Sequence, residues 1–394
     1  MNFFLFLGGI FLFSFLVGIL LEKIRIPWIF SALILGFGGS FYSPFKEIAD
    51  NKTFIFLTWL GMYFLLFLIG FELEIEKIKE LGKFIVKSTF FIIFFEALFG
   101  TLLVHFIFKS SWLVSVLVGL SFATVGEAVL IPILDDFKLI KTKLGQLILG
   151  IGTFDDIIEV LLIIIIALLI PFFFGVKKTI FNFNEILLII GSILVLFLFS
   201  FGILKLKRRV SLMRVKKVEA IFILVLAIFF LFLGIGSLTE TAALGALLAG
   251  LTAKNFLPEK RLKEIEDDIK SLTYGFFGPI FFFWVGLDTN FHYLISHFWL
   301  VFLVIIVTSL AKIVASYLIG KDKIGLKPSL FMGVALGVRF STSIVIIKFL
   351  FEEKLIGIKL YSVLIGASAG FVILIPFLLS FLANKWRPSL QKEF

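Results

Sequence analysis

Apolar runs of about 18–25 residues recur along the whole chain, and each is long enough to cross a hydrocarbon core about 30 Å thick. Mean hydropathy is +1.15, and 60% of the residues are hydrophobic, against about half in soluble domains. The first run lacks a positively charged leader and a small-residue cleavage site, so we interpret it as a retained span. The sequence therefore predicts an all-α polytopic membrane protein.

We predict thirteen transmembrane spans. Their ranges are 3–22, 27–42, 53–71, 84–108, 112–134, 145–172, 184–204, 219–236, 240–256, 271–287, 293–320, 328–350 and 358–384. Lys and Arg concentrate in the loops after the odd-numbered spans, such as 205–217 and 254–270. By the positive-inside rule, the N-terminus is expected outside and the C-terminal tail in the cytoplasm.

The chain also contains a weak internal repeat. "PWIFSALILGFGGSFYSP" at 27–44 aligns with "ETAALGALLAGLTAKNFLP" at 240–258, and "KLGQLILGIG" with "KLYSVLIGAS", at offsets of 214 and 216. Two sets of six spans separated by one connecting span have opposite orientations in the membrane. The sequence therefore predicts an inverted repeat, an architecture found in many secondary transporters.

Clusters of Gly, Ser and Thr interrupt the spans 112–134 and 328–350, which align with each other. Unwound backbone at this depth is tolerated only around a buried or watery cavity, so we predict two crossed discontinuous helices. Glu127 and Arg339 lie in these clusters, where they would neutralise helix dipole ends, pair across the crossing or handle ions directly. The predicted cavity residues are Thr124, Glu127, Arg339, Ser341 and Thr342.

Three carboxylates, Asp155, Asp156 and Glu159, lie within five residues of the sixth span. Each costs roughly 2.5–3.5 kcal/mol at the middle of a bilayer, so an intramembrane acid is by default a functional hypothesis. Asp155 and Asp156 point about 100° apart on a helix, and Glu159 shares a face with either. We predict that the two aspartates form a functional site in the membrane, with Glu159 and Thr153 as candidate neighbours of that site.

Two further charges, Glu96 and Lys312, occupy equivalent positions of the repeat at an offset of 216. An unpaired buried ammonium is costly, so Lys312 is expected to pair with one of the two aspartates. Lys312 and Glu96 are both candidates for ion pairing and proton coupling. Lys87 and Lys348 lie near span ends, and we expect both to extend to the membrane surface.

The segments "GTFDDIIEV", "FATVGEAVLIPIL", "FFGPIFFFWVGLD" and "LAKIVAS" resemble those of the monovalent cation:proton antiporters. The most similar branch is the second, which contains bacterial sodium/proton antiporters and Kef-like potassium/proton systems. The resemblance implies thirteen helices, two crossed broken helices and a homodimer. It also implies that Asp156 is the cation- and proton-binding carboxylate, that Asp155 pairs with Lys312, and that the adjacent aspartates follow the electrogenic sodium-type pattern.

The same resemblance implies a core moving against a scaffold. The scaffold and dimer part would comprise 1–82 and 219–290, the core 83–175 and 291–384, with 184–217 as linker helix and cytoplasmic loop and 385–394 as cytoplasmic tail.

The expected function is antiport, not enzymatic catalysis: Na⁺ or Li⁺ is exchanged for H⁺ at the buried aspartate pair, without a cofactor. The expected location is the cytoplasmic membrane of a prokaryote, with a role in pH homeostasis. A K⁺/H⁺ antiporter of Kef-like type is the main alternative, and a Na⁺-coupled solute symporter is another. An intramembrane aspartyl protease is disfavoured, because its aspartates lie on different helices in a GxGD motif that this chain lacks.

Overall fold

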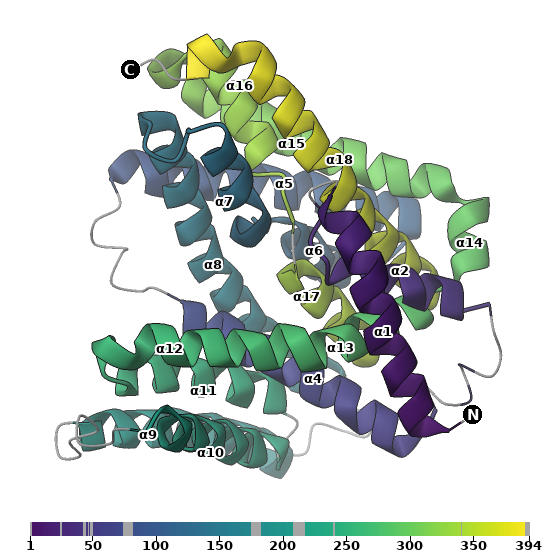
Figure 1. The fold of residues 1–394 in the computed structure, drawn as a ribbon, viewed down its shortest axis with the longest axis vertical. Helices are drawn as coiled ribbons and strands as arrows, with labels where there is room; N and C mark the ends of the chain where they lie inside the picture. The colour runs from purple at the N-terminus through teal and green to yellow at the C-terminus, as the bar shows by residue number, and fades with distance from the viewer. Residues whose placement is uncertain are drawn as a thin grey trace. The chain divides into compact units, whose positions relative to one another are not determined.

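The computed structural model describes residues 2–23, 26–41, 45, 47, 50–73, 82–174, 183–207, 217–238, 241–339 and 341–390. Every regular element in these ranges is helical, as predicted (Figure 1). Most of the predicted cytoplasmic loop at 205–217 and the end of the tail, 391–394, lie outside the described residues.

Among the described residues, six helices are long and apolar enough to cross a membrane. They are α1 (Phe3–Glu22), α4 (Lys52–Glu72), α5 (Lys83–Phe108), α10 (Val218–Ser237), α15 (Phe298–Ile324) and α18 (Ile358–Leu390). Shorter apolar segments occur in α2 (Phe30–Gly39), α6 (Trp112–Phe122), α9 (Phe183–Lys207) and α11 (Ala242–Phe256). The other elements are α7 (Glu127–Asp136), α8 (Lys143–Phe174), α12 (Glu259–Lys270), the π-helix η3 (Ser271–Phe277), α13 (Gly278–Leu287), α14 (Phe291–Ser296), α16 (Leu326–Ala335) and α17 (Ser341–Glu352).

Polar residues just before the apolar runs fix where several helices begin. The Asn2 side chain accepts a hydrogen bond from the Phe4 amide at 2.9 Å, and Asn51 accepts one from the Thr53 amide at 2.8 Å. These side chains satisfy backbone N–H groups that have no acceptor within the first helical turn. The apolar runs and their caps therefore determine these helix starts locally.

Two helices are interrupted where the Gly, Ser and Thr clusters predicted breaks. The chain leaves the helical conformation over residues 123–126, between α6 and α7, and again after Ala335, between α16 and α17. The Gly126 amide donates a hydrogen bond to the Val338 carbonyl at 2.7 Å. The two non-helical segments therefore lie directly against each other.

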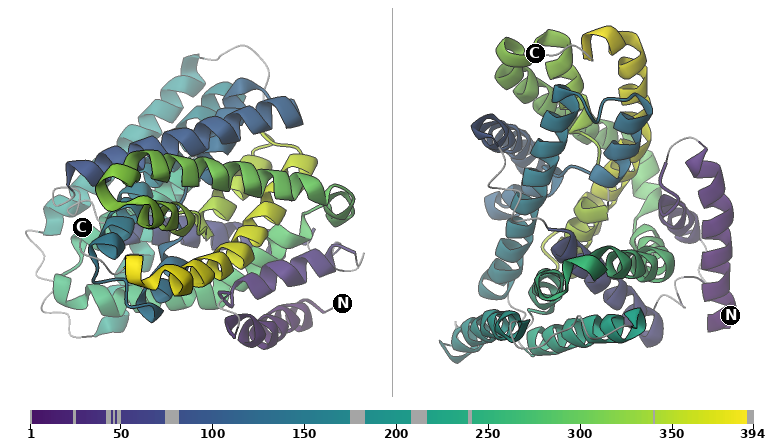
Figure 2. Two further views of the ribbon diagram at one scale, coloured as in Figure 1. Left: turned by 90° about the horizontal axis from the view of Figure 1, so that it is seen from above. Right: turned by 60° about the vertical axis from the view of Figure 1, so that its left-hand side comes forward.

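The chain forms two compact units. The first comprises residues 1–46, 74–159 and 282–394, and the second comprises 47–73 and 160–281. In the first unit, α5 packs on α6 and α15, and α15 packs on α16 and α18 (Figures 1 and 2). In the second unit, α11 packs between α4 and α10. The division into a moving core and a scaffold stays a prediction.

Two glycines allow half-helices of the first unit to approach their neighbours closely. A Cβ on Gly119 of α6 would lie 2.6 Å from the Ala97 carbonyl oxygen of α5. A Cβ on Gly333 of α16 would lie 2.6 Å from the Ile313 Cα of α15. Small residues of this kind let helix backbones approach each other in membrane proteins. α6 and α16 are therefore seated on α5 and α15 by backbone contact.

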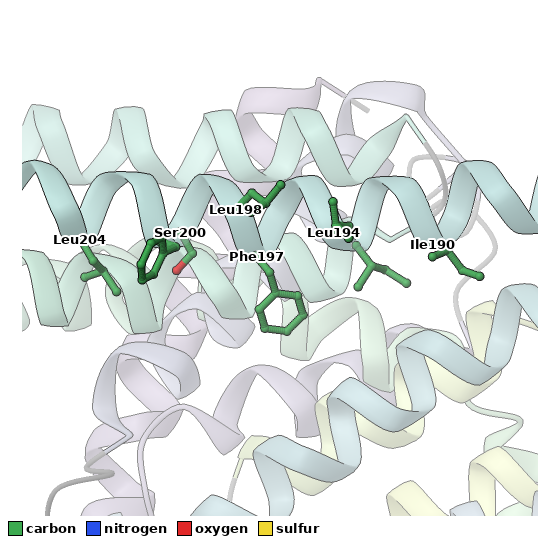
Figure 3. Close-up of a pocket in the computed structure, with 8 residues that line it drawn as sticks. Ile190, Leu194, Phe197, Leu198, Ser200 and Leu204 are labelled. Atoms are coloured by element: carbon green, nitrogen blue, oxygen red, sulfur yellow. The ribbon is translucent and has the colours of Figure 1, made fainter.

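Large apolar side chains are exposed on many helices, as expected of a surface that faces lipid. Phe4 is 80% exposed and Phe377 is 76% exposed. In the second unit, eight α9 side chains line a hollow, and Figure 3 shows Leu194, Phe197 and Leu198 among them. Soluble monomers rarely expose contiguous apolar surface on this scale.

The predicted cytoplasmic loop at 254–270 contains a helix, α12, which the sequence reading missed. Ile265 and Ile269, one helical turn apart, are buried, and the other residues of α12 are charged except for Leu262. The high charge of this segment concealed a narrow apolar stripe, which is enough to hold a short helix against its neighbours.

Candidate ion-binding site

One buried carboxylate, Glu96 on α5, holds two cationic side chains. Lys312 Nζ lies 2.8 Å from Glu96 Oε2, and Arg339 Nη2 lies 2.7 Å from Glu96 Oε1. All three side chains are at most 2% exposed. Removing one partner of a buried pair leaves an uncompensated charge, so the three residues depend on one another.

Lys312 also joins the two helix breaks. Its ammonium donates to the Leu336 carbonyl at 2.8 Å and to the Thr124 carbonyl at 3.3 Å. The ion pair with Glu96 adds a third contact to these two hydrogen bonds. Both carbonyls lie just beyond the C-terminal ends of half-helices, where the helix dipole is negative. Lys312 therefore compensates the dipole ends, which is one of the roles that the sequence left open for Glu127 and Arg339.

Arg339 is held from several sides within the second break. Its Nη2 donates to Thr308 Oγ1 at 3.2 Å as well as to Glu96. The centre of its guanidinium group lies 3.8 Å from the ring centroid of Phe371 and 4.6 Å from that of Phe122. The guanidinium group therefore lies close to two aromatic rings, which attract its charge.

Glu127 begins α7, and its side chain lies outside the described residues. The expected pairing of Glu127 with Arg339 across the crossing stays a prediction. In the structure Arg339 bonds Glu96 of α5, a partner that we did not predict.

The acidic residues of α8 lie beside this cluster. Asp155 is 2% exposed and Glu159 is 4% exposed, whereas Asp156 is half-buried. Asp155 lies close enough to Arg339 and to Glu159 for their charges to interact, and Lys312 lies close enough to Glu159 for the same. The structure therefore brings the predicted acids and cations of α5, α8, α15 and the second break into one region.

The remaining candidate residues are hydroxyl-bearing. Thr124 and Ser341 are buried, Thr342 is half-buried, and the Thr153 hydroxyl donates to the Leu149 carbonyl at 3.0 Å. Their role as oxygen ligands for a cation stays a prediction. The pairing of Asp155 with Lys312 also stays a prediction.

Lys348 does not extend to the membrane surface, contrary to our prediction. It is fully buried, and its ammonium pairs with Asp288 and with Glu352. Lys87 is exposed, which is compatible with the position predicted for it. Both lysines lie near predicted span ends, and nothing in the sequence indicated that Asp288 pairs with Lys348.

The sequence reading also missed Thr308, Phe122 and Phe371 as neighbours of Arg339. One signal was available for Phe371, because the offset of 216 aligns it with Asp155. The first half of the repeat supplies an acid at this position, and the second supplies the aromatic ring that lies over Arg339.

A family model described as "Sodium/hydrogen exchanger, transmembrane" matches residues 11–385. The chain belongs to this family. The expected resemblance to monovalent cation:proton antiporters is therefore confirmed. The family is one of transporters, and the chain is a multi-pass membrane protein.

Two relatives illustrate the similarity in sequence. The chain is 23% identical over 372 residues to a Na⁺/H⁺ antiporter of Enterococcus hirae, covering 94% of this chain and 90% of the relative. It is 27% identical over 343 residues to the K⁺/H⁺ antiporter subunit KhtU of Bacillus subtilis, covering 84% and 82%.

The fold is similar to the solved structure of the sodium proton antiporter MjNhaP1 from Methanocaldococcus jannaschii. The TM-score is 0.64 at 19% identity, covering 98% of this chain and 97% of that one. The likeness shows that this chain has the same fold as that antiporter.

Proposed function

We propose that the chain is a secondary antiporter that exchanges Na⁺ for H⁺ by alternating access. The observation that carries the proposal is the buried cluster of Glu96, Lys312 and Arg339 at the meeting point of two broken helices, beside Asp155 and Asp156. Family membership supports the same conclusion. Li⁺ is expected to replace Na⁺.

In the proposed mechanism, a cation and a proton compete for the aspartate pair. Asp156 is half-buried and Asp155 is buried, so Asp156 is the more accessible acid and the better candidate for exchange. When deprotonated, Asp156 binds Na⁺ together with Asp155 and hydroxyl or carbonyl oxygens near the breaks. An empty, doubly ionised site is costly to carry through the membrane, so the core moves only with Na⁺ or protons bound.

The inverted repeat and the thirteen spans belong to this proposal. The two breaks occupy equivalent positions of the repeat. Gly119 and Gly333 are aligned at an offset of 214, and each sits against the backbone of an equivalent helix. Glu96 and Lys312 are likewise equivalent and form an ion pair. Three pairs at similar spacings, of about 214 to 216 residues, support two related halves.

The rest of the proposal concerns organisation in the cell. We place the N-terminus outside and the C-terminus in the cytoplasm, in the cytoplasmic membrane of a prokaryote. The core at 83–175 and 291–384 moves against the scaffold at 1–82 and 219–290, and the scaffold forms a homodimer. Lipid surrounds the assembly.

K⁺/H⁺ exchange is the second candidate function. The relative named K⁺/H⁺ antiporter subunit KhtU covers most of this chain. Such an antiporter shares the fold and the competition, and differs in the size of the cation cavity. A Na⁺-coupled solute symporter would instead require substrate-dependent Na⁺ uptake without proton movement.

Everted membrane vesicles with a pH-sensitive dye test the proposal. Addition of NaCl or LiCl is expected to collapse a respiration-generated pH gradient, whereas collapse by KCl alone supports the second candidate. Asp156→Asn removes the exchangeable charge and should abolish the response. Asp155→Asn should keep partial exchange, and Glu219→Gln, on an exposed part of α10, serves as the control for expression. Full exchange by Asp156→Asn would contradict the assignment.

A further inference from the structure

A second buried ion cluster lies outside the proposed cation site, around Lys348 of α17. The side chain of Lys348 is 0% exposed. Its ammonium bonds Asp288, which follows the end of α13, and lies 2.7 Å from Glu352 Oε1. The carboxylates of Asp288 and Glu352 are 30% and 20% exposed, respectively. The cluster therefore connects a fully buried cation with two acids that reach the surface.

Aromatic rings from three helices surround the ammonium. Lys348 Nζ lies 3.5 Å from the ring centroid of Trp284 on α13, 5.2 Å from that of Phe351 on α17 and 5.4 Å from that of Tyr361 on α18. Each ring presents negative charge density to the cation. The Tyr361 hydroxyl also donates to the Val285 carbonyl of α13 at 2.8 Å. Lys348 is therefore the central contact between α13 on one side and α17 and α18 on the other.

The two carboxylates differ in one respect that matters for movement. Glu352 is four residues after Lys348 on the same helix, so it stays with the lysine wherever α17 goes. Asp288 belongs to the end of α13, so it stays with the lysine only while α13 and α17 remain together. If α17 leaves α13, Lys348 loses one partner and keeps the other.

We propose that the ion pair between Lys348 and Asp288 is a latch that closes this end of the protein by holding the end of α13 against α17. Glu352 keeps Lys348 paired when the latch opens. The inference rests on the proposed function, in which α17 and α18 belong to the moving core and α13 to the scaffold. Lys348 is a positioning residue in this scheme, because it acts on the cation site only through the placement of α17.

The ion pair with Glu352 explains how the buried ammonium of Lys348 can release its other partner during each transport cycle. Breaking a buried pair is costly mainly because it leaves an unpaired buried charge. Glu352 removes that penalty, so opening costs only the second ion pair and the contact with Trp284. By the orientation proposed above, the latch closes the outer end of the pathway.

Opposite effects of the two carboxylates on opening test the proposal. The natural chain has no cysteine, so Ser362→Cys, at a buried position of α18 beside the latch, gives a single reactive thiol. In that background, Asp288→Asn should raise the rate of alkylation by a membrane-impermeant maleimide about two- to fivefold, as expected for loss of one partly exposed ion pair. Glu352→Gln should lower it, because opening then leaves Lys348 unpaired. A cluster that serves only stability would be loosened by both changes, so an increase in both variants would overturn the latch.

A cross-link provides a second test. The Asn290 amide donates to Ser362 Oγ at 2.7 Å, so paired cysteines at these positions join α13's following turn to α18. Oxidation of the Asn290→Cys/Ser362→Cys variant should abolish exchange, a reductant should restore it, and each single variant should be insensitive to the oxidant. Unchanged exchange by protein that is fully cross-linked on a non-reducing gel would overturn the latch. Alkylation is measured without transport, so the latch and the proposed function can fail separately.

Discussion

Arg339 Nη2 lies 2.7 Å from Glu96 Oε1, although the two residues are 243 positions apart in the chain. The other oxygen of the same carboxylate is 2.8 Å from Lys312 Nζ. One acid on α5 therefore balances a lysine on α15 and an arginine in the second helix break. Glu96 is the residue on which the charge balance of the site most depends.

Neutralising Glu96 should destabilise the protein strongly. Glu96→Gln leaves two buried cations without their shared counter-charge, a loss of about 3–5 kcal/mol for a broken buried pair. We expect a clearly lower thermal midpoint in detergent and loss of exchange. Glu219→Gln is the matched control, because Glu219 is exposed. Equal midpoints for the two variants would show that the ion pairs contribute nothing to stability.

A double-mutant cycle should reveal direct coupling between Glu96 and Lys312. Each single change, Glu96→Gln or Lys312→Met, removes the ion pair between the two residues, and the double variant loses that same pair only once. The double variant should therefore be less destabilised than the sum of the singles, by about 0.5–3 kcal/mol. The free energy of unfolding in mild detergent measures this difference, and strict additivity would argue against the contact.

Arg339→Lys should be a damaging change despite the conserved charge. A lysine cannot donate to Glu96 and Thr308 in the planar geometry of a guanidinium group, nor present a planar group to the rings of Phe122 and Phe371. We expect a loss of about 1–3 kcal/mol in the free energy of unfolding. The same measurement on Lys87→Arg, at an exposed position, should give no change.

Gly119→Ala should disturb the packing of α6 on α5. The added methyl group would lie 2.6 Å from the Ala97 carbonyl oxygen, so the helices must separate. Overpacking of this kind costs typically about 1–3 kcal/mol. Gly9→Ala is the control, since a methyl group there meets nothing within 4 Å. Thermal midpoints should fall for the first variant alone.

The pairing of α12 with α4, outside the spans, should depend on pH in the alkaline range. Burial lowers the pKa of Lys270, but its hydrogen bond to Glu266 and the nearby Glu72 outweigh this, so the pKa lies above its ordinary value of 10.5. A group with a raised pKa contributes stability that is fully present below the unfolded pKa of 10.5. That contribution is lost as the pH rises through the pKa of the group in the folded protein. Lys270→Met should therefore lower the thermal midpoint slightly at pH 8, consistent with the about 0–1 kcal/mol of an exposed pair. The difference from the unmodified chain should shrink at pH 11, and a difference that grows would contradict the assignment.

Local patterns predicted part of this structure. The Gly, Ser and Thr clusters predicted both breaks, because such residues favour unwound backbone wherever they occur. The repeat offset aligned Glu96 with Lys312 as equivalent charges, but the predicted partner of Lys312 was an aspartate, and the contact with Glu96 came from the structure. The breaks and the alignment can both be identified without knowing how the helices pack.

The contacts that the sequence did not predict depend on how helices are rotated about their axes. Which acid faces Arg339 is decided by the packing of α5 against the second break, and no local pattern encodes that rotation. Lys348 was misplaced for the same reason, since an apolar run ending in lysine looks the same whether its end meets solvent or Asp288.

The backbone contacts at Gly119 and Gly333 limit how the site can deform. Where main chain meets main chain, there are no rotamers to rearrange, so α6 cannot slide along α5, nor α16 along α15, without a collision. Each pair must travel as a rigid block. Bending is then confined to the non-helical residues 123–126 and 336–339. Any movement of the charged side chains between the helices requires movement of a whole helix pair.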